Sequence, residues 1–257
     1  MTPLRTAKPL SGLRVLVPRG GEWGNAIAAT LRLKGATPVI APMINFASTE
    51  NAAALVDALA RLQSGAFDWI VVTSATTVDV LMSHEVKVPE ATRIAAVGET
   101  TGSALALAGY RVDFAPDKDN STRGLVKEWP SVKPSGRVLI PQSDVPEENL
   151  VAGLEQLGLE AEFVTAYRTV GVPVAAEVIA SVADGRIGAI LVTSGSVARQ
   201  IQAQLAPLPG GTVVASIGPR TAFDARAAGI AVDVIAESRT ADALVDALVE
   251  HVRSLGA

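Results

Sequence analysis

The stretch Ile70-Val71-Val72-Thr73-Ser74 returns 120 positions later as Ile190-Leu191-Val192-Thr193-Ser194. The same interval relates Ala96-Val97-Gly98-Glu99-Thr100-Thr101 to Ser216-Ile217-Gly218-Pro219-Arg220-Thr221. A second pair of segments lies 123 positions apart, because Arg14-Val15-Leu16-Val17-Pro18 matches Arg137-Val138-Leu139-Ile140-Pro141. A repeat of so long a period predicts two similar domains rather than a solenoid of short units.

Short apolar runs alternate with amphipathic stretches along the whole chain. Ten runs are predicted strands: residues 13–17, 38–41, 69–72, 94–97, 112–115, 138–140, 162–164, 189–192, 213–217 and 232–235. Most are apolar throughout, which is typical of parallel strands covered by helices on both faces. Helices are expected between them, among others at residues 25–34, 51–63, 99–108, 147–157, 219–228 and 241–255. We therefore predict an α/β protein with two similar doubly wound, flavodoxin-like parallel sheets.

Four glycines mark the ends of predicted helices. Gly35, Gly109, Gly158 and Gly229 each follow a helical pattern and precede a strand. Such a position commonly takes a left-handed conformation that glycine adopts without strain, so we predict helix C-termini there.

The repeated segments can be assembled in two ways. A simple tandem places residues 12–129 in one domain and residues 136–252 in the other. A swapped arrangement pairs residues 136–166 with the middle of the chain, while the first 43 residues join the C-terminal part. The residues alone leave both arrangements open.

Composition excludes several classes of function. The chain has 257 residues, no cysteine and two histidines, which excludes disulfides, thiolate catalysis, zinc–thiolate sites and iron–sulfur clusters. A net charge of −4 without a basic stripe argues against nucleic-acid binding. No apolar run reaches the roughly 20 residues that span a bilayer, and residues 1–11 lack the apolar core of a secretory signal. We expect a cytoplasmic monomer that binds neither nucleic acid nor membrane.

Eight loops are expected at the carboxyl ends of the strands, where open parallel sheets bind ligands. Seven of the eight contain a serine or threonine, and three of these also contain a glycine: 18–21, 73–76, 98–101, 120–122, 141–143, 193–196, 218–221 and 238–240. Each hydroxyl can simply cap a helix. Together the loops can also form an array of donors that suits anionic oxygens. Arg19, Arg220 and Arg239 can add charge-assisted contacts or be ordinary surface arginines.

Two nucleotide-binding signatures are missing. Gly20, Gly21 and Gly24 lack the G-x-G-x-x-G spacing, and no P-loop motif occurs.

The motifs, in their order and spacing, resemble the uroporphyrinogen-III synthase family. The resemblance runs from Gly12 to Val252 and is carried by residues 14–19, 72–74, 97–101, 165–169, 217–221 and 236–240. It implies the swapped arrangement, with one domain from residues 1–43 and 172–257 and the other from 47–165. It also implies a two-stranded crossover at residues 44–46 and 166–171, and an active site in the cleft.

The resemblance implies a reaction as well. The family's enzymes are lyases that cyclise the linear tetrapyrrole hydroxymethylbilane, without a cofactor or metal, inverting ring D and losing water. It further implies that the substrate is handed over from the bilane-forming deaminase.

Site residues follow from the resemblance position by position. Tyr167 falls on the family's linker tyrosine and, with Thr101, is predicted to be catalytic; the alternative is a tyrosine that only packs at the domain junction. Ser74, Ser194, Thr221 and Thr240 match hydroxyl residues that line the family's cleft. The full set of predicted substrate-binding residues adds neighbours from the candidate loops: Arg19, Thr76, Gly98, Ser143, Gly195, Ser196 and Gly218. Gln142-Ser143 departs from the Arg-Gly that many relatives carry.

Two other functions remain compatible with the residues. One is a two-lobed binding protein or sensor that closes on a small polyanion without chemistry. The other is a sugar-phosphate or nucleotide enzyme of flavodoxin-like fold.

Overall fold

The computed structural model describes residues 8–145 and 148–255, which form two compact units. Unit 1 consists of the described residues up to Asn45 and those from Val170 onward. Unit 2 consists of the described residues from Phe46 to Thr169. Each unit contains one five-stranded sheet.

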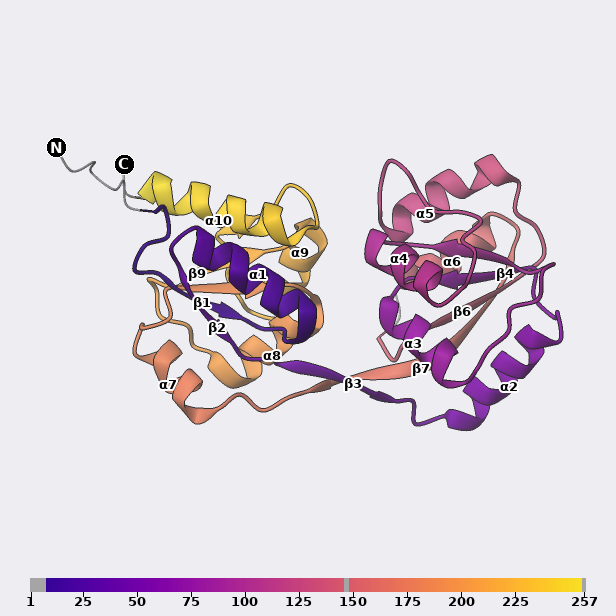
Figure 1. Ribbon diagram of the computed structural model, residues 1–257, viewed down its shortest axis with the longest axis horizontal. Coiled ribbons are helices and arrows are strands. Elements are labelled where there is room, and N and C mark those ends of the chain that lie inside the picture. Colours follow the sequence, from indigo (N-terminus) through magenta and orange to yellow (C-terminus); the bar gives the residue numbers. More distant parts are fainter. Residues whose placement is uncertain (1–7, 146–147, 256–257) are drawn as a thin grey trace. The chain divides into compact units, whose positions relative to one another are not determined.

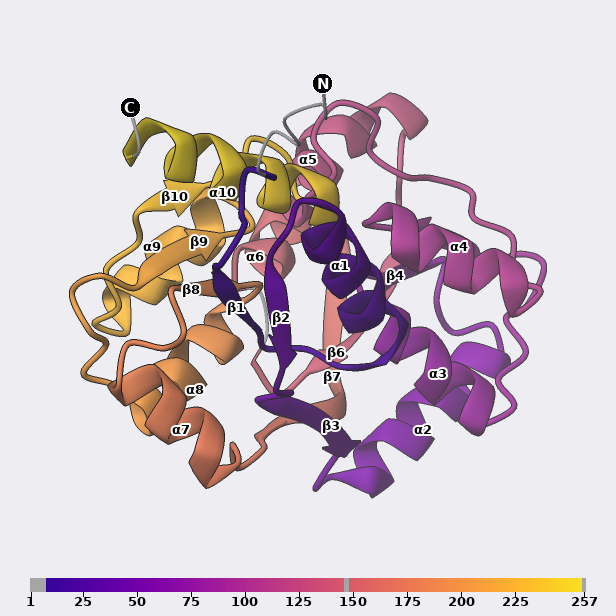
Figure 2. The ribbon, with the colours of Figure 1, turned by 60° about the vertical axis from the view of Figure 1, so that its left-hand side comes forward.

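The sheet of unit 1 has the order β10-β9-β8-β1-β2, and its neighbouring strands are parallel. Its strands are β1 (Arg14–Val17), β2 (Thr37–Ile40), β8 (Ala189–Val192), β9 (Val213–Ser216) and β10 (Val234–Ile235). Helices α1 (Gly21–Leu33) and α10 (Ala241–Leu255) lie side by side on one face, as Figure 2 shows. The other face packs against α7 (Ala176–Ala183), α8 (Gly195–Leu205) and α9 (Pro219–Ala227).

The alternation of side chains along β1 explains why unit 1 has two cores. Val15 and Val17 point to the face that α1 and α10 cover. Leu16 points to the opposite face, against α7, α8 and α9. Because successive strand residues face opposite sides, an unbroken apolar run is buried on both.

The sheet of unit 2 has the order β3-β7-β6-β4-β5. Its strands are β3 (Ile44–Ser48), β4 (Trp69–Val72), β5 (Arg93–Ala96), β6 (Arg137–Ser143) and β7 (Glu160–Gly171). Helices α2 (Ala52–Gln63), α3 (Ala75–Ser83) and α4 (Glu99–Leu107) cover one face. The other face packs against α5 (Thr122–Glu128), the 3-10 turn Trp129–Val132 and α6 (Glu148–Gln156). Figure 1 shows β3 and β7 running past the residues at which the chain passes from one unit to the other.

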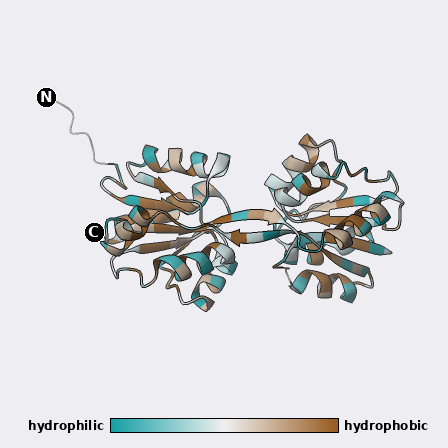
Figure 3. Ribbon diagram, turned by 90° about the horizontal axis from the view of Figure 1, so that it is seen from below, coloured by the Kyte–Doolittle hydropathy of each residue, from teal (hydrophilic) through white to brown (hydrophobic). Residues whose placement is uncertain are grey.

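The predicted fold class is confirmed: each unit is a doubly wound α/β layer structure. Strands β1 and β2 share a sheet with β8, β9 and β10, and β6 and β7 share one with β4 and β5, which is the swapped arrangement. Figure 3 shows apolar strands enclosed by helices that carry the polar residues. Within the described ranges, no helix combines the length and apolar character needed to cross a membrane.

The four predicted helix ends are also confirmed. Gly35, Gly109, Gly158 and Gly229 have φ values of 97°, 83°, 82° and 86°, all in the left-handed region. Residue 147, at the start of the predicted helix 147–157, lies outside the described residues; the helix is described from Glu148.

Several strand predictions were wrong in extent. Residues 112–115 form only a single bridge, between Phe114 and Ala95, and the Asp113 carboxylate accepts the Ile94 amide hydrogen beside it. Strand β7 continues to Gly171, well beyond the predicted end at residue 164. Its second half, Thr165 to Gly171, mixes polar and apolar residues and is partly exposed, so a search for unbroken apolar runs misses it. The same applies to β3, so only the resemblance, with its two-stranded crossover at residues 44–46 and 166–171, predicted strands in these two segments.

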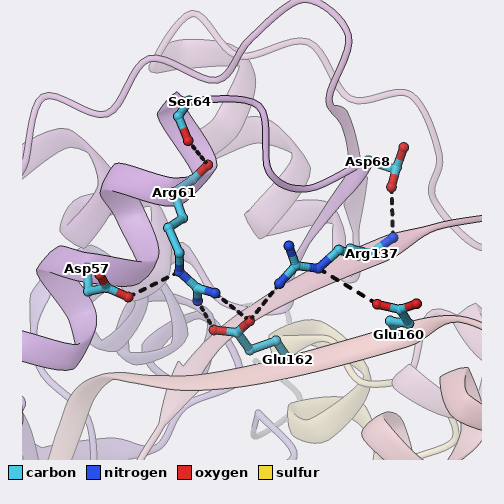
Figure 4. A network of polar contacts seen from close by, with 7 residues as sticks. All are labelled: Asp57, Arg61, Ser64, Asp68, Arg137, Glu160 and Glu162. Atoms are coloured by element: carbon cyan, nitrogen blue, oxygen red, sulfur yellow. Dashed lines mark hydrogen bonds and ion pairs between the residues drawn. The ribbon is translucent and has the colours of Figure 1, made fainter.

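An ionic cluster in unit 2 ties helix α2 to the amino ends of β6 and β7 (Figure 4). The Glu162 carboxylate accepts hydrogen bonds from Arg61 and lies 3.5 Å from the guanidinium of Arg137. Both guanidiniums also lie over the ring of Phe67, with centroid distances of 5.2 Å and 5.0 Å. Hydrogen bonding to Glu162 raises the pKa of Arg61. The corresponding residue of unit 1, 123 positions earlier, is the apolar Val39.

Candidate active site

The order of the strands defines one place in each sheet where a ligand is expected. In unit 1 the chain winds outward in opposite directions from β1 and β8, and in unit 2 from β6 and β4. The carboxyl ends of the two central strands at such a reversal form a crevice that binds ligands in open α/β sheets. We call this place the switch point of each unit.

Arg19 follows β1 at the switch point of unit 1. The backbone of Arg19 packs directly against α1, because a Cβ on Gly24 would collide with the Arg19 carbonyl oxygen. The guanidinium lies over the Trp23 ring, 5.0 Å from the centroid. Burial lowers the pKa of Arg19, because the cation has lost part of its hydration. None of the ion pairs among the described residues involves Arg19.

Thr193 lies on the other side of the same switch point, at the end of β8. Continuing the register of β1 and β8, in which Leu16 faces Ile190, places Arg19 opposite Thr193. The Thr193 Oγ1 atom is buried and makes no hydrogen bond within residues 8–145 and 148–255. A buried hydroxyl without a partner is uncommon and calls for an explanation.

The next residues form the start of α8. Ser194 caps the helix, since its Oγ accepts the Val197 amide hydrogen at 3.2 Å. Ser196 Oγ accepts a hydrogen bond from Arg199 at 3.0 Å. Gly195 has no room for a side chain, because a Cβ there would lie 2.8 Å from an Asp224 oxygen. For Ser194, capping is therefore the role that the structure records.

The switch point of unit 2 is occupied by its own side chains. Gln142 is only 4% exposed, and its Nε2 donates a hydrogen bond to Thr73 Oγ1 at 3.2 Å. Thr77 Oγ1 donates to the Pro141 carbonyl at 3.2 Å, which ties α3 to β6. Ser74 caps α3 by accepting the Thr76 amide hydrogen at 3.0 Å. The polar groups at this edge thus satisfy one another.

Residues 141–143 are the end of strand β6 rather than a loop, which corrects the sequence prediction. Ser143 Oγ donates to the Val145 carbonyl and accepts the Val145 amide hydrogen, so it holds the turn that follows the strand. The prediction failed because Pro141, Gln142 and Ser143 look like turn residues, yet their backbone pairs with β7.

Equivalent glycine and threonine residues follow β5 and β9. Thr101 and Thr221 lie in the first turns of α4 and α9, and each is 4% exposed. Gly98 has a φ of 95°, and a Cβ there would lie 3.4 Å from Thr101 Oγ1. Any other residue at position 98 would therefore place its Cβ against the Thr101 hydroxyl. The Gly98 amide donates to Asn120 Oδ1 at 2.7 Å.

The remaining predicted residues of unit 1 lie at the same sheet edge. Thr240 Oγ1 accepts the Ala243 amide hydrogen at 3.2 Å and so caps α10. Gly218 packs against the stem of Arg239, whose Cγ would lie 3.2 Å from a Cβ on that glycine. Arg220 is mostly exposed and paired with Asp224 at 3.1 Å.

Tyr167 lies in β7 and belongs to unit 2. Its side chain is 8% exposed and packs in the core cluster that includes Val164. Its ring meets that of Phe46 edge to face, with centroids 5.4 Å apart and planes at 85°. The register of β6 and β7 places Tyr167 beside Ser143. Tyr167 therefore reaches the same sheet edge as the unit 2 switch point.

The predicted site residues thus fall into two groups, each gathered at the carboxyl edge of one sheet. Unit 1 holds Arg19, Ser194, Gly195, Ser196, Gly218, Thr221 and Thr240, and unit 2 holds Ser74, Thr76, Gly98, Thr101, Ser143 and Tyr167. Sequence reasoning missed Thr193 and Trp23. The repeat contained a signal for Thr193. It aligns Thr73 with an identical residue, Thr193, but aligns Gln142 with a different one, Arg19.

Neither the surface hollows nor a cluster of metal-binding side chains identifies another site in the described residues. Hollows of about 560 Å³ and 440 Å³ lie at the amino ends of β9 and β5, lined by residues such as Thr212 and Thr92. They form between turns at equivalent places in the two units and contain none of the predicted site residues. Within the described part of the chain, no group of three histidine, aspartate or glutamate side chains could hold a metal ion.

The fold and these edges define a class: a two-unit, doubly wound α/β protein whose sheet edges present hydroxyl groups, helix starts and an arginine, Arg19, that forms no ion pair with the described residues. A family model described as uroporphyrinogen-III synthase HemD matches residues 25–246. The chain belongs to that family.

Individual relatives agree with the family match. A protein named uroporphyrinogen-III synthase from Synechococcus elongatus is 26% identical over 96% of this chain and 98% of its own length. A porphyrin biosynthesis protein HemD from Ruminiclostridium josui is also 26% identical over 95% of this chain, but the chain spans about half (49%) of its length.

Solved structures share the fold. A uroporphyrinogen III synthase mutant from Thermus thermophilus matches with a TM-score of 0.64 at 16% identity, covering 95% of this chain and 99% of its own. The uroporphyrinogen-III synthetase of Helicobacter pylori matches with a TM-score of 0.61 at 15% identity, covering 93% and 99%.

Proposed function

We propose that the chain converts hydroxymethylbilane into uroporphyrinogen III, closing the macrocycle with inversion of ring D and loss of water. The observation that carries the proposal is the family match over residues 25–246. The proposed enzyme is a cofactor-independent, cytoplasmic lyase that acts as a monomer and receives its substrate from the deaminase that forms the bilane. Activity that survives prolonged dialysis against a chelator is the expected result for cofactor independence.

Binding of the polycarboxylate substrate is assigned to the carboxyl edges of the two sheets. Each helix start there carries a partial positive charge and contributes about 0.3–1 kcal/mol to a nearby anion. The hydroxyls of Ser74, Ser194 and Thr240 cap those helices and can also face a ligand. Several such ends can bind carboxylates even though the protein carries a net charge of −4.

The chemical step is assigned to Tyr167, with Thr101 beside Gly98 as a second hydroxyl. The Tyr167 phenol donates a hydrogen bond to the hydroxyl of the bilane as it leaves. The C–O bond breaks, water departs with the donated proton, and an azafulvenium cation remains beside the Tyr167 phenolate. The substituted carbon of ring D attacks the methylene carbon of that cation and forms a spiro intermediate. That intermediate fragments and closes again with ring D inverted, and the phenolate takes up the proton whose loss restores the pyrrole.

The protein's main contribution is the conformation in which the bilane reacts. Unassisted closure gives the symmetric isomer, so the enzyme must hold ring D with its substituted carbon next to the reacting carbon. Holding reacting atoms in such a geometry can offset about 7–11 kcal/mol of the barrier. The edge-to-face contact between Tyr167 and Phe46 fixes the phenol ring for this purpose.

The test is to incubate the protein with hydroxymethylbilane, oxidise the products and separate the porphyrin isomers. Uroporphyrin III in excess over the isomer formed without protein is the expected result. Isomer I alone would contradict the proposal. If polycarboxylates nevertheless raised the unfolding temperature, the protein would instead bind a polyanion without chemistry.

A further inference from the structure

The two switch points occupy equivalent positions in their units but differ in the side chains found there and in how those side chains are hydrogen-bonded. In unit 2, Gln142 donates to Thr73, and both polar groups are satisfied. In unit 1 the corresponding residues, by the intervals of 123 and 120 positions, are Arg19 and Thr193. Arg19 lies on Trp23 with no acidic partner in the described residues, and the buried Thr193 hydroxyl lacks a hydrogen bond there. Among the described residues, unit 1 thus has a cation without an acidic partner and a hydroxyl without a hydrogen bond. Unit 2 has the hydrogen-bonded pair Gln142 and Thr73 at the same place, which we call its closed pair.

Two features of unit 1 maintain this open state. The Trp23 ring holds the guanidinium by a cation–π contact, which leaves its N–H groups available for a ligand. Gly20 and Gly24 allow the turn after Arg19 to pack closely, since a Cβ on Gly20 would lie 3.0 Å from Pro42 and one on Gly24 would strike the Arg19 carbonyl. Leaving a partly buried cation and a hydroxyl without partners costs stability, so the arrangement points to a ligand that supplies the missing acceptor.

We propose that the switch point of unit 1 is a subsite for one carboxylate of the tetrapyrrole, bound by Arg19 and Thr193, with Trp23 as the positioning residue of Arg19. The inference rests on the proposed function for the identity of the ligand. A planar guanidinium can donate two parallel hydrogen bonds to a carboxylate. The Thr193 hydroxyl donates a third, when movement of the side chains around it uncovers the oxygen. The closed pair of unit 2 offers no such site among its described residues.

The deciding variant is Arg19→Gln, which gives unit 1 the amide that unit 2 has. The KM for hydroxymethylbilane should rise about tenfold, the size expected for loss of one charge-assisted interaction, with kcat nearly unchanged. The unfolding temperature of the free protein should rise, because the new amide can bond to Thr193 as Gln142 bonds to Thr73. Weaker binding together with higher stability cannot result from misfolding.

The matched control is Arg32→Gln, which removes one exposed positive charge from the last turn of α1, the helix that follows Arg19. Its KM should stay within about twofold of the unmodified protein, since exposed charges away from a site interact weakly with ligands. Trp23→Leu should raise KM about threefold and Trp23→Phe should restore it, because a phenyl ring still supports the guanidinium. Thr193→Val should raise KM without lowering stability.

Equilibrium binding of uroporphyrin III separates this inference from the proposed function, because it requires no turnover. Weaker binding to the Arg19→Gln protein than to the Arg32→Gln protein supports the subsite even if no isomer III is made. Equal binding by both, or an unchanged KM for Arg19→Gln in a protein that does make isomer III, would overturn the subsite and leave the proposed function standing.

Discussion

Unit 1 and unit 2 share a strand order, a set of covering helices and the hydroxyls that begin those helices, yet they present different groups to a ligand. In unit 2 the residue at this position of the repeat is Gln142, near the end of β6, which is buried and bonded to Thr73. In unit 1 it is Arg19, which lies on Trp23 without an acid. Conversely, Tyr167 of unit 2 corresponds, 123 positions earlier, to Ile44. The two units thus share a scaffold, and the proposed division of labour gives charge binding to unit 1 and proton donation to unit 2.

The largest expected effect concerns this division of labour. Tyr167→Phe should lower kcat for isomer III about 100-fold, because a positioned proton donor contributes about 10²–10⁴ to a rate. The measurement is steady-state turnover with isomer separation.

The chain's other tyrosine provides the control. Tyr110 donates its hydroxyl hydrogen to the Val86 carbonyl at 2.7 Å and lines the hollow at the amino end of β5, away from the carboxyl edge of the sheet. Tyr110→Phe should leave kcat unchanged and cost roughly 1 kcal/mol of unfolding free energy. Equal turnover by the two variants would show that Tyr167 only packs against Phe46.

Most of the fold could be predicted from the sequence, and the reasons are physical. Strands such as 69–72 and 189–192 are buried on both faces, so their composition alone identifies them. Segments with one exposed face, such as β3 and the second half of β7, carry mixed residues and gave no such signal. The apolar runs could not decide between tandem and swapped domains, since both give the same strands; only the pairing of β1 with β8 and of β6 with β4 distinguishes them.

The candidate site could be predicted in outline only. The repeat located the loops that follow the strands, but it could not tell that Ser194 caps α8 or that Thr101 is buried. The sequence shows that Gln142 and Arg19 differ at equivalent positions of the repeat. Its meaning depends on a hydrogen bond in one unit and its absence in the described part of the other, which only coordinates reveal.

The second prediction concerns Thr73 and Thr193, which occupy equivalent positions in the two units, and it tests whether their hydroxyls differ in bonding. Thr73→Val removes the acceptor of the Gln142 amide and should destabilise the protein by about 1–3 kcal/mol. Thr193→Val removes a buried hydroxyl that has no partner in the described residues, and should leave stability unchanged or raise it by up to about 1 kcal/mol. Urea unfolding of both variants gives the two free energies. Equal losses would mean that Thr193 is bonded in solution and that the switch points do not differ.

A smaller effect is expected for the ionic cluster that unit 1 lacks. Glu162→Gln leaves Arg61 and Arg137 without their shared carboxylate (Figure 4). Because these side chains are about one third exposed, solvent screening limits the expected loss to roughly 1 kcal/mol. Val39→Ile, at the corresponding position of unit 1, should not change the salt dependence of stability. The loss in Glu162→Gln should shrink at high salt, and a salt-independent loss would exclude an electrostatic origin.

The smallest effect depends on pH. Hydrogen bonds from Ser121, followed by Arg123, lower the pKa of Asp119. A lowered pKa in the folded state means that the ionised group stabilises the fold above the unfolded pKa and loses that effect as the pH falls through the folded pKa. Asp119→Asn should therefore reduce stability at neutral pH but not in strong acid. A difference from the unmodified protein that is the same at every pH would contradict the assignment.

The most direct test of the contrast between the two units is a crystal structure of the protein with bound uroporphyrin III. We predict a carboxylate within hydrogen-bond distance of the Arg19 guanidinium at the switch point of unit 1, while Gln142 remains bonded to Thr73 in unit 2. A bound tetrapyrrole with no carboxylate at Arg19, or with its carboxylates at Gln142 instead, would contradict the account.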